Sequence, residues 1–202
     1  MDIIINHLSK RFGKKEVITN FSARIKEGRV TSLMAPSGWG KTTLLRIMAG
    51  LEKLDEGRIE GLEKKRISMV FQEDRLCGNL SPVSNIRLVC SGKVQESRIY
   101  EELERAGLKG EELVPAKNLS GGMRKRVALV RALIVPFDLL ILDEPFDGLD
   151  DENKMRMIDY VKERSEGKTV ILVTHEKKEA EAMGGEMING LYCIRSGMEP
   201  KQ

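Results

Sequence analysis

The sequence is poor in the features that mark secreted, membrane-spanning and fibrous proteins. Its 202 residues contain three cysteines (Cys77, Cys90 and Cys193), an odd number with no CxxC pair. They indicate free thiols in a reducing compartment rather than a disulfide framework or a zinc site. The longest apolar runs have four residues, as in Leu139–Leu142, so no segment is long enough to cross a bilayer. The opening MDIIINHLSK has neither a basic start nor a long apolar stretch, so we expect no secretory signal.

Excess charge of one sign is also lacking. Lys and Arg number 34 against 31 Asp and Glu, a formal net charge of +3 that is too small to indicate a nucleic-acid partner. Apolar residues make up 41% and charged residues 32%, which is typical of a folded globular protein. The length suits one domain, residues 1–202, with room for a small inserted lobe.

Strand and helix patterns alternate along the chain and predict a mostly parallel α/β fold. Residues 73–135 carry helical spacing and no convincing strand, which indicates an inserted helical subdomain. Met187-Ile188 and Leu191–Cys193 flank Asn189-Gly190, a pattern that predicts a hairpin. The expected strands are 3–8, 21–25, 30–34, 67–71, 139–142 and 169–173, and the expected helices are 41–51, 97–106, 122–134, 152–164 and 175–183.

A glycine-rich loop between an expected strand and an expected helix predicts a nucleotide-binding site. The segment fits [AG]-x4-G-K-[ST], with Ala35 where Gly is usual. Glycines let backbone N–H groups approach phosphate oxygens, and the helix N-terminus adds its dipole. Lys41 is expected to reach the β- and γ-phosphates, and the Thr42 hydroxyl to ligate Mg²⁺. The alternative is a turn with a surface lysine. The expected phosphate-loop residues are Ala35, Pro36, Ser37, Gly38, Trp39, Gly40, Lys41, Thr42 and Thr43.

Two acids follow the most apolar expected strand, in Leu139-Leu140-Ile141-Leu142-Asp143-Glu144. Carboxyl ends of parallel strands meet at one edge of a sheet, where the phosphate loop should also lie. Asp143 is then placed to hold Mg²⁺, as a Walker B acid does. Glu144 is placed to polarise a water for attack on the γ-phosphate. The alternative is a strand that ends in a polar turn.

The sequence resembles the ABC-transporter ATPase family once further motifs are added. Leu119-Ser120-Gly121-Gly122-Met123 matches the signature, and the match runs on through Asp143-Glu144-Pro145 to Val173-Thr174-His175. The resemblance implies a P-loop NTPase (RecA-like) core, a small N-terminal antiparallel β region and the helical subdomain. It also implies ATP and Mg²⁺ as cofactors. Two ATP molecules would lie between two head-to-tail subunits, with a homodimer the simplest case.

The same resemblance implies roles for further residues. His175 would bond the γ-phosphate, Gln72 would contact Mg²⁺ or water, and Phe12 would stack on adenine. Ser120, Gly121 and Gly122 would bind the ATP of the opposing subunit at a helix start. The alternatives are a capping histidine, a surface amide, a core phenylalanine and an ordinary N-cap serine. Residues 147–150 resemble the loop that couples the two sites.

The resemblance extends to a transport role. It implies an ATP-hydrolysing subunit at the cytoplasmic face of the cell membrane, bound to transmembrane permease subunits and served by an extracytoplasmic substrate-binding protein. LSGGM, FQEDRL and EPFDGLD are most similar to the nitrate, sulfonate and taurine importer group. Lys125 stands where Gln is frequent in the family. Export or lipoprotein release is the alternative, a non-catalytic scaffold is disfavoured by Glu144 and His175, and a nucleotide kinase is more remote.

The single tryptophan lies between two loop glycines, Gly38 and Gly40. Its backbone must face the phosphates, so we expect the Trp39 ring to point away from them, toward an opposing subunit. The alternative is a ring that lies on its own subunit.

Overall fold

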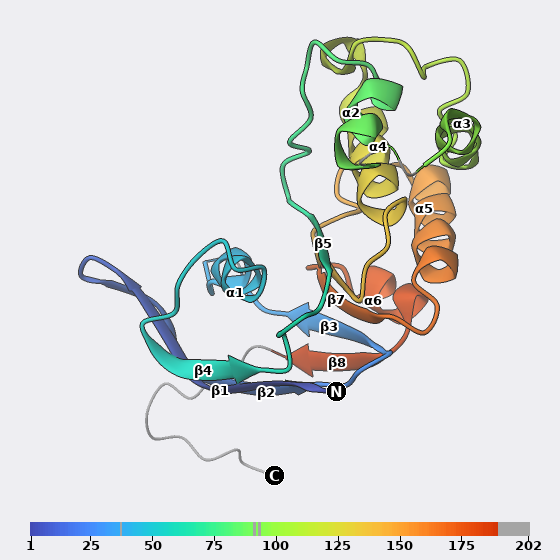
Figure 1. Cartoon of the computed structure of the whole chain (residues 1–202). Helices are drawn as coiled ribbons and strands as arrows, with labels where there is room; N and C mark the ends of the chain where they lie inside the picture. Colours follow the sequence, from blue (N-terminus) through green and yellow to red (C-terminus); the bar gives the residue numbers. More distant parts are fainter. Residues whose placement is uncertain (37, 91, 93, 190–202) are drawn as a thin grey trace.

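Two sheets and the helices packed on them make up the part of the chain that the computed structural model describes, residues 1–36, 38–90, 92 and 94–189 (Figure 1). The antiparallel sheet has the order β2 (Lys15–Ile25), β1 (Ile3–Phe12), β4 (Glu56–Glu60). The second sheet is parallel. Its order is β5 (Ile67–Val70), β6 (Leu139–Asp143), β7 (Thr169–Val173), β3 (Val30–Met34), β8 (Glu186–Asn189). The predicted mixed α/β class with a small antiparallel region is confirmed.

Helix α1 (Lys41–Met48) is the next element after β3 and lies over the antiparallel sheet (Figure 1). The other helices gather on the opposite side of the parallel sheet. They are α2 (Pro82–Cys90), α3 (Glu96–Arg105), the 3₁₀ turn η1 (Ala116–Asn118), α4 (Gly121–Leu133), α5 (Asp151–Arg164) and α6 (Lys177–Met183). None of the helices in the described residues has both the length and the apolarity that a bilayer crossing requires.

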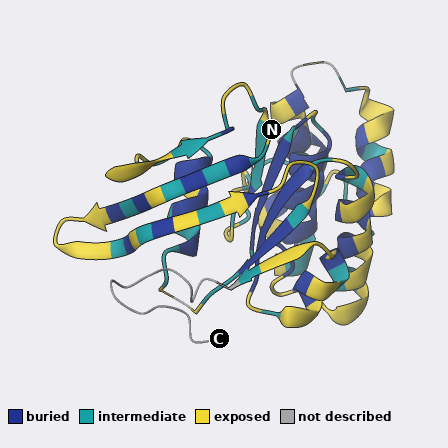
Figure 2. Ribbon diagram, turned by 90° about the horizontal axis from the view of Figure 1, so that it is seen from below, coloured by how far each residue is buried: buried dark blue, intermediate teal, exposed yellow. Residues whose placement is uncertain are grey.

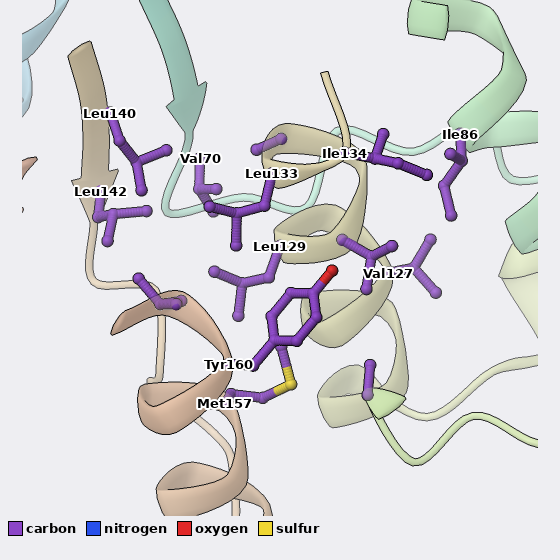
Figure 3. Packing of buried hydrophobic residues seen from close by; sticks show 14 of the residues in the cluster. Val70, Ile86, Val127, Leu129, Leu133, Ile134, Leu140, Leu142, Met157 and Tyr160 are labelled. Carbon is purple, nitrogen blue, oxygen red and sulfur yellow. The ribbon is translucent and has the colours of Figure 1, made fainter. Parts of the chain in front are cut away.

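The parallel sheet separates two hydrophobic cores because successive side chains of a strand point to opposite faces. On one face, Leu139 and Ile141 of β6 pack with α1 and the antiparallel sheet. On the other, Leu140 and Leu142 pack with helices α2 to α5 (Figure 3). Strands β6 and β7 are buried throughout, whereas the antiparallel sheet has exposed residues in alternation (Figure 2). This burial explains why the apolar runs 139–142 and 169–173 predicted strands correctly.

Residues 73–135 are helical wherever they form regular structure in the described part of the segment, as expected. Leu129 and Leu133 of α4 share one core with Leu140 and Leu142 of β6 (Figure 3). That this segment is a subdomain of its own stays a prediction.

Sequence analysis did not predict strand β4, helix α2 or the turn η1, and it predicted a different partner for the strand at 186–189. Strand β4 has a mostly exposed, polar sequence, so no apolar alternation marks it. Helix α2 opens with Pro82, and the Ser81 hydroxyl accepts a hydrogen bond from the Ser84 N–H, a start signal that the sequence did carry. Residues 186–189 form a strand, but in the described structure it pairs in parallel with β3. The rest of the expected hairpin lies outside the described residues.

Candidate functional site

The phosphate loop joins β3 to α1 as predicted. One of its residues, Gly40, can only be glycine. Gly40 caps α1 with φ +95°. A Cβ at this position would lie 2.8 Å from the Val17 carbonyl oxygen and 2.9 Å from the Ile18 side chain. Strand β2 therefore presses on the loop, and only glycine fits. Ala35 is not among the residues with positive φ, so its departure from the usual Gly costs no backbone strain. Ser37 lies outside the described residues.

Lys41 lies over the loop. Its Nζ donates to the Ala35 carbonyl at 2.6 Å and to the Pro36 carbonyl at 3.2 Å, and the residue is 8% exposed. The ammonium and the start of α1 thus meet at the same loop, where both favour an anion. Thr42 and Thr43 continue the first turn of α1.

Asp143 ends β6 as a buried carboxylate, 2% exposed. Its Oδ2 has no hydrogen-bond partner. Burial raises the pKa of Asp143, with the Glu144 charge adding to the rise, while the Thr42 hydroxyl and the Lys41 ammonium oppose it. An unpaired carboxylate oxygen beside a threonine hydroxyl fits a hard cation such as Mg²⁺. No cluster of three or more His, Cys, Asp or Glu in the described residues could hold a metal alone, so such an ion would need oxygens of the nucleotide as well.

Three residues predicted to be catalytic come together at the ends of three neighbouring strands. The Glu144 Oε2 lies 3.4 Å from the Gln72 Nε2 and 3.6 Å from the His175 Nδ1. Glu144 has φ +47°, a left-handed conformation that costs a non-glycine residue about 1–2 kcal/mol. Its N–H donates to the Val173 carbonyl at 2.9 Å, which holds the strained turn against β7. The fold therefore fixes the Glu144 carboxylate between an amide and an imidazole.

The predicted signature begins α4. The Ser120 Oγ accepts a hydrogen bond from the Met123 N–H at 3.2 Å, so the N-cap alternative describes what this hydroxyl does here. Ser120 and Gly121 are exposed. A Cβ on Gly122 would lie 3.3 Å from Leu149 and 3.5 Å from the Gly148 carbonyl, so the signature packs on the 147–150 loop. The start of α4, at Ser120 and Gly121, is therefore open to solvent.

A family model described as "ABC transporter" matches residues 18–147. The chain belongs to this family. It is 36% identical to a probable sulfate/thiosulfate import ATP-binding protein of Chlorella vulgaris, covering 93% of this chain and 86% of that one. It is 35% identical to an Fe(3+) ions import ATP-binding protein of Escherichia coli O157:H7, covering 91% of this chain and 58% of that one.

The fold of this ABC cassette is also that of a solved relative. A dimeric post-hydrolysis structure of the ATP-binding cassette MJ0796, bound to ADP and Pi, superposes with a TM-score of 0.82 at 29% identity. The alignment covers 93% of each chain. The chain is thus an ABC ATP-binding cassette, although it spans only 58% of some importer relatives, such as the sulfate/thiosulfate protein of Xanthomonas campestris.

The two aromatic side chains singled out in the cassette sequence differ in outcome. Phe12 ends β1 and is 48% exposed, with the Lys10 Nζ 5.1 Å from the ring centroid. It is therefore not a core residue, and its stacking on adenine stays a prediction. The expectation for Trp39 was wrong. Its ring meets Phe21 of β2 edge to face, with centroids 5.3 Å apart, so it lies on its own subunit.

A salt-bridge group that sequence analysis did not predict lies behind His175. The Lys154 Nζ of α5 lies 2.8 Å from Glu176 and 2.9 Å from the buried Glu179. The Thr174 hydroxyl donates to Glu179 at 2.5 Å and accepts from the Glu176 N–H at 3.0 Å. The turn that carries His175 is thus fixed on both sides. Lys154 and Glu176 are 22 residues apart, so no local pattern announces the contact.

Proposed function

We propose that this cassette is the ATP-hydrolysing subunit of an importer and that it works as a head-to-tail dimer. One observation carries the proposal: Gln72, Glu144 and His175 meet at one carboxylate oxygen. A carboxylate held beside a phosphate site can act as a base for attack on the γ-phosphate, whereas nucleotide binding alone requires no base.

Each residue of the proposed site has its own role in ATP binding or hydrolysis. The Lys41 ammonium and the loop N–H groups bind the β- and γ-phosphates, and Thr42, Asp143 and Gln72 hold Mg²⁺, which neutralises phosphate charge when bound. The Glu144 carboxylate accepts a proton from the attacking water. The His175 imidazole bonds the γ-phosphate and holds it in line.

Phe12 stacks on the adenine ring. The Ser120 hydroxyl and the N–H groups of Gly121 and Gly122 at the start of α4 bind the γ-phosphate held by the opposing subunit. Each ATP therefore needs both subunits. We propose two copies of this chain as the pair.

The transported solute is small, in our proposal. Relatives are named for import of sulfate or thiosulfate and of Fe(3+), so the nitrate, sulfonate and taurine group indicated by the signature is one candidate among several. Export or lipoprotein release is the less favoured alternative. Choice of solute would rest with permease subunits and an extracytoplasmic binding protein.

A groove of about 460 Å³ is the surface that we propose for the permease, at the cytoplasmic face of the membrane. It lies between the end of α1, strand β5 and helices α2 and α4, and its apolar lining includes Leu51, Phe71 and Val89. Leu51 is 58% and Val89 41% exposed. Phe71 precedes Gln72, so a permease segment in this groove would contact the chain beside the catalytic group.

The experiment that tests the proposal is Glu144→Gln. The amide keeps the shape of the carboxylate but cannot accept the proton, so we expect ATP to bind while turnover falls by roughly 10²-fold or more. Lys41→Ala serves as the contrast, because it should weaken ATP binding itself. Wild-type turnover in Glu144→Gln would remove Glu144 from its role. Phosphate transfer to a nucleotide instead of water would favour the kinase alternative.

A further inference from the structure

Helix α4 holds the backbone of the segment that carries Gln72. The Lys125 Nζ donates to the Gln72 carbonyl at 2.5 Å. One turn and a half further along, the Arg131 guanidinium donates to the Asp74 carbonyl at 3.1 Å and to the Arg75 carbonyl at 2.9 Å. Two cations of one helix thus bind three backbone carbonyls of residues 72–75.

Of these two cations, Lys125 is the one that contacts Gln72, the residue whose side chain reaches Glu144. It is 6% exposed, so its aliphatic stem and its ammonium are both out of water. The Asp74 carboxylate lies 3.9 Å from the Lys125 ammonium and only 3.2 Å from the Arg124 guanidinium. Asp74 therefore keeps a close cation without Lys125. The short contact of the ammonium is the one to the Gln72 carbonyl.

The Gln72 side chain depends on where its backbone lies. Residue 72 follows β5 and is exposed, and its Nε2 reaches Glu144 at 3.4 Å, which is a long hydrogen bond. A small shift of the backbone would break that contact. A misplacement of about 1 Å can cost as much as 10²-fold in rate.

We propose that Lys125 is a positioning residue for hydrolysis: by binding the Gln72 carbonyl, it holds the Gln72 amide toward Glu144. This rests on the proposed function. Lys125 contacts neither the phosphate loop nor Asp143 in the described structure, so its effect belongs to the chemical step and not to ATP binding. The N-cap of the same helix is Ser120, so Lys125 also connects the signature to the Gln72 of its own subunit.

The test is Lys125→Met, which keeps the buried stem and removes the donor. We expect kcat to fall by about tenfold, with the Kd for ATP and the thermal midpoint close to wild type. Lys125→Arg restores a cationic donor and should recover part of kcat. Lys162→Met is the control, because the Lys162 Nζ also donates to a backbone carbonyl, that of Ala182 at 3.0 Å, far along the chain from Gln72. It should leave kcat unchanged.

A double-mutant cycle with Gln72→Ala separates positioning from a general structural role. If Lys125 acts through the Gln72 side chain, Lys125→Met should add no further loss of kcat in the Gln72→Ala background. The same fold-loss in both backgrounds would overturn the proposal, as would unchanged kcat in folded Lys125→Met. A parallel fall of ATP affinity and thermal midpoint would also overturn it.

Should Lys125→Met not fold, Lys125→Leu carries the same cycle, because leucine fills part of the space of the buried stem and also has no donor for the Gln72 carbonyl. Its outcomes count in the same way. Wild-type protein that binds ATP without hydrolysing it would instead defeat the proposed function, so the two failures are distinguishable.

Discussion

Asp143, which we propose as a Mg²⁺ ligand, shows what a buried carboxyl group costs a fold. The carboxyl group is 2% exposed and one of its oxygens lacks a hydrogen-bond partner. Burial raises its pKa despite the Thr42 hydroxyl and the Lys41 ammonium nearby. A carboxyl whose pKa is higher in the folded than in the unfolded state binds its proton more tightly when folded. The stability that it contributes is therefore greatest at low pH and falls as pH rises from the ordinary Asp pKa through the raised one.

We expect Asp143→Asn to stabilise the nucleotide-free protein at pH 7, because the amide removes an unpaired buried charge. The gain over wild type should shrink as pH falls through the raised pKa of Asp143 and should be gone below the ordinary Asp pKa of about 4. Urea unfolding at a series of pH values measures this difference. Asp159→Asn, on an exposed position of α5, should change stability by less than about 0.5 kcal/mol. A less stable Asp143→Asn at pH 7 would contradict the argument.

At the scale of elements, helices α5 and α6 are joined by ions and not only by apolar packing. Lys154 of α5 contacts Glu176 at the start of α6 and Glu179 within it. The Lys154 side chain is 14% and the Glu179 side chain 4% exposed, so this pair is partly desolvated. Hydrogen bonds from Lys154 hold the pKa of Glu176 below its ordinary value. The group fixes the two helices around the His175 turn.

Lys154→Met should destabilise the protein by about 2–4 kcal/mol, because the buried Glu179 then lacks its cation. Lys177→Met is the matched control: Lys177 pairs with Glu181 at 3.2 Å, but its side chain is 72% exposed, so the change should cost less than about 1 kcal/mol. Urea denaturation measures the loss of unfolding free energy in each variant. Equal losses would show that the contact of Lys154 with Glu179 adds nothing beyond a surface ion pair.

The sequence predicted the elements whose signal is local. Leu139–Leu142 is an unbroken apolar run, and the structure confirms it as a buried strand. The Glu56–Glu60 strand was missed because only its pairing with β1 makes it a strand. The orientation of Trp39 depends on Phe21, a residue of the other sheet, and the fixing of His175 depends on Lys154. Such contacts between distant residues leave no pattern in the residues themselves. The roles of Gln72 and His175 came from the family resemblance.

For the whole molecule, the signature is the part of the proposed site that the single chain leaves exposed. Ser120 and Gly121 are exposed at the start of α4, and Trp39 packs on its own Phe21 rather than reaching outward. A second subunit would therefore meet the exposed helix start. The related cassette MJ0796 has been solved as a dimer.

We expect the Glu144→Gln protein to dimerise with ATP and to stay monomeric with ADP, since in the proposed arrangement the signature binds the γ-phosphate of the opposing subunit, which ADP lacks. Sedimentation in the two nucleotides measures the mass directly. Replacing Ser120 by Ala in the same protein should weaken the ATP-bound dimer. The same mass with both nucleotides would reject the head-to-tail arrangement.

The strand order also decides when, during synthesis, a nucleotide could first bind. Strand β3 carries the phosphate loop, yet its neighbours β7 and β8 come near the far end of the described chain, with Val30 paired to Val170 and Thr31 to Glu186. Pairing between segments so distant in sequence is slow, because a long loop must close first. A nascent chain whose residues up to 173 have not all left the ribosome contains the whole phosphate loop. Strand β3, which carries that loop, then has neither of its neighbours β7 and β8 in the sheet. Strand β3 and its phosphate loop therefore remain without neighbouring strands in the sheet until the segment that carries β7 and β8 has been made.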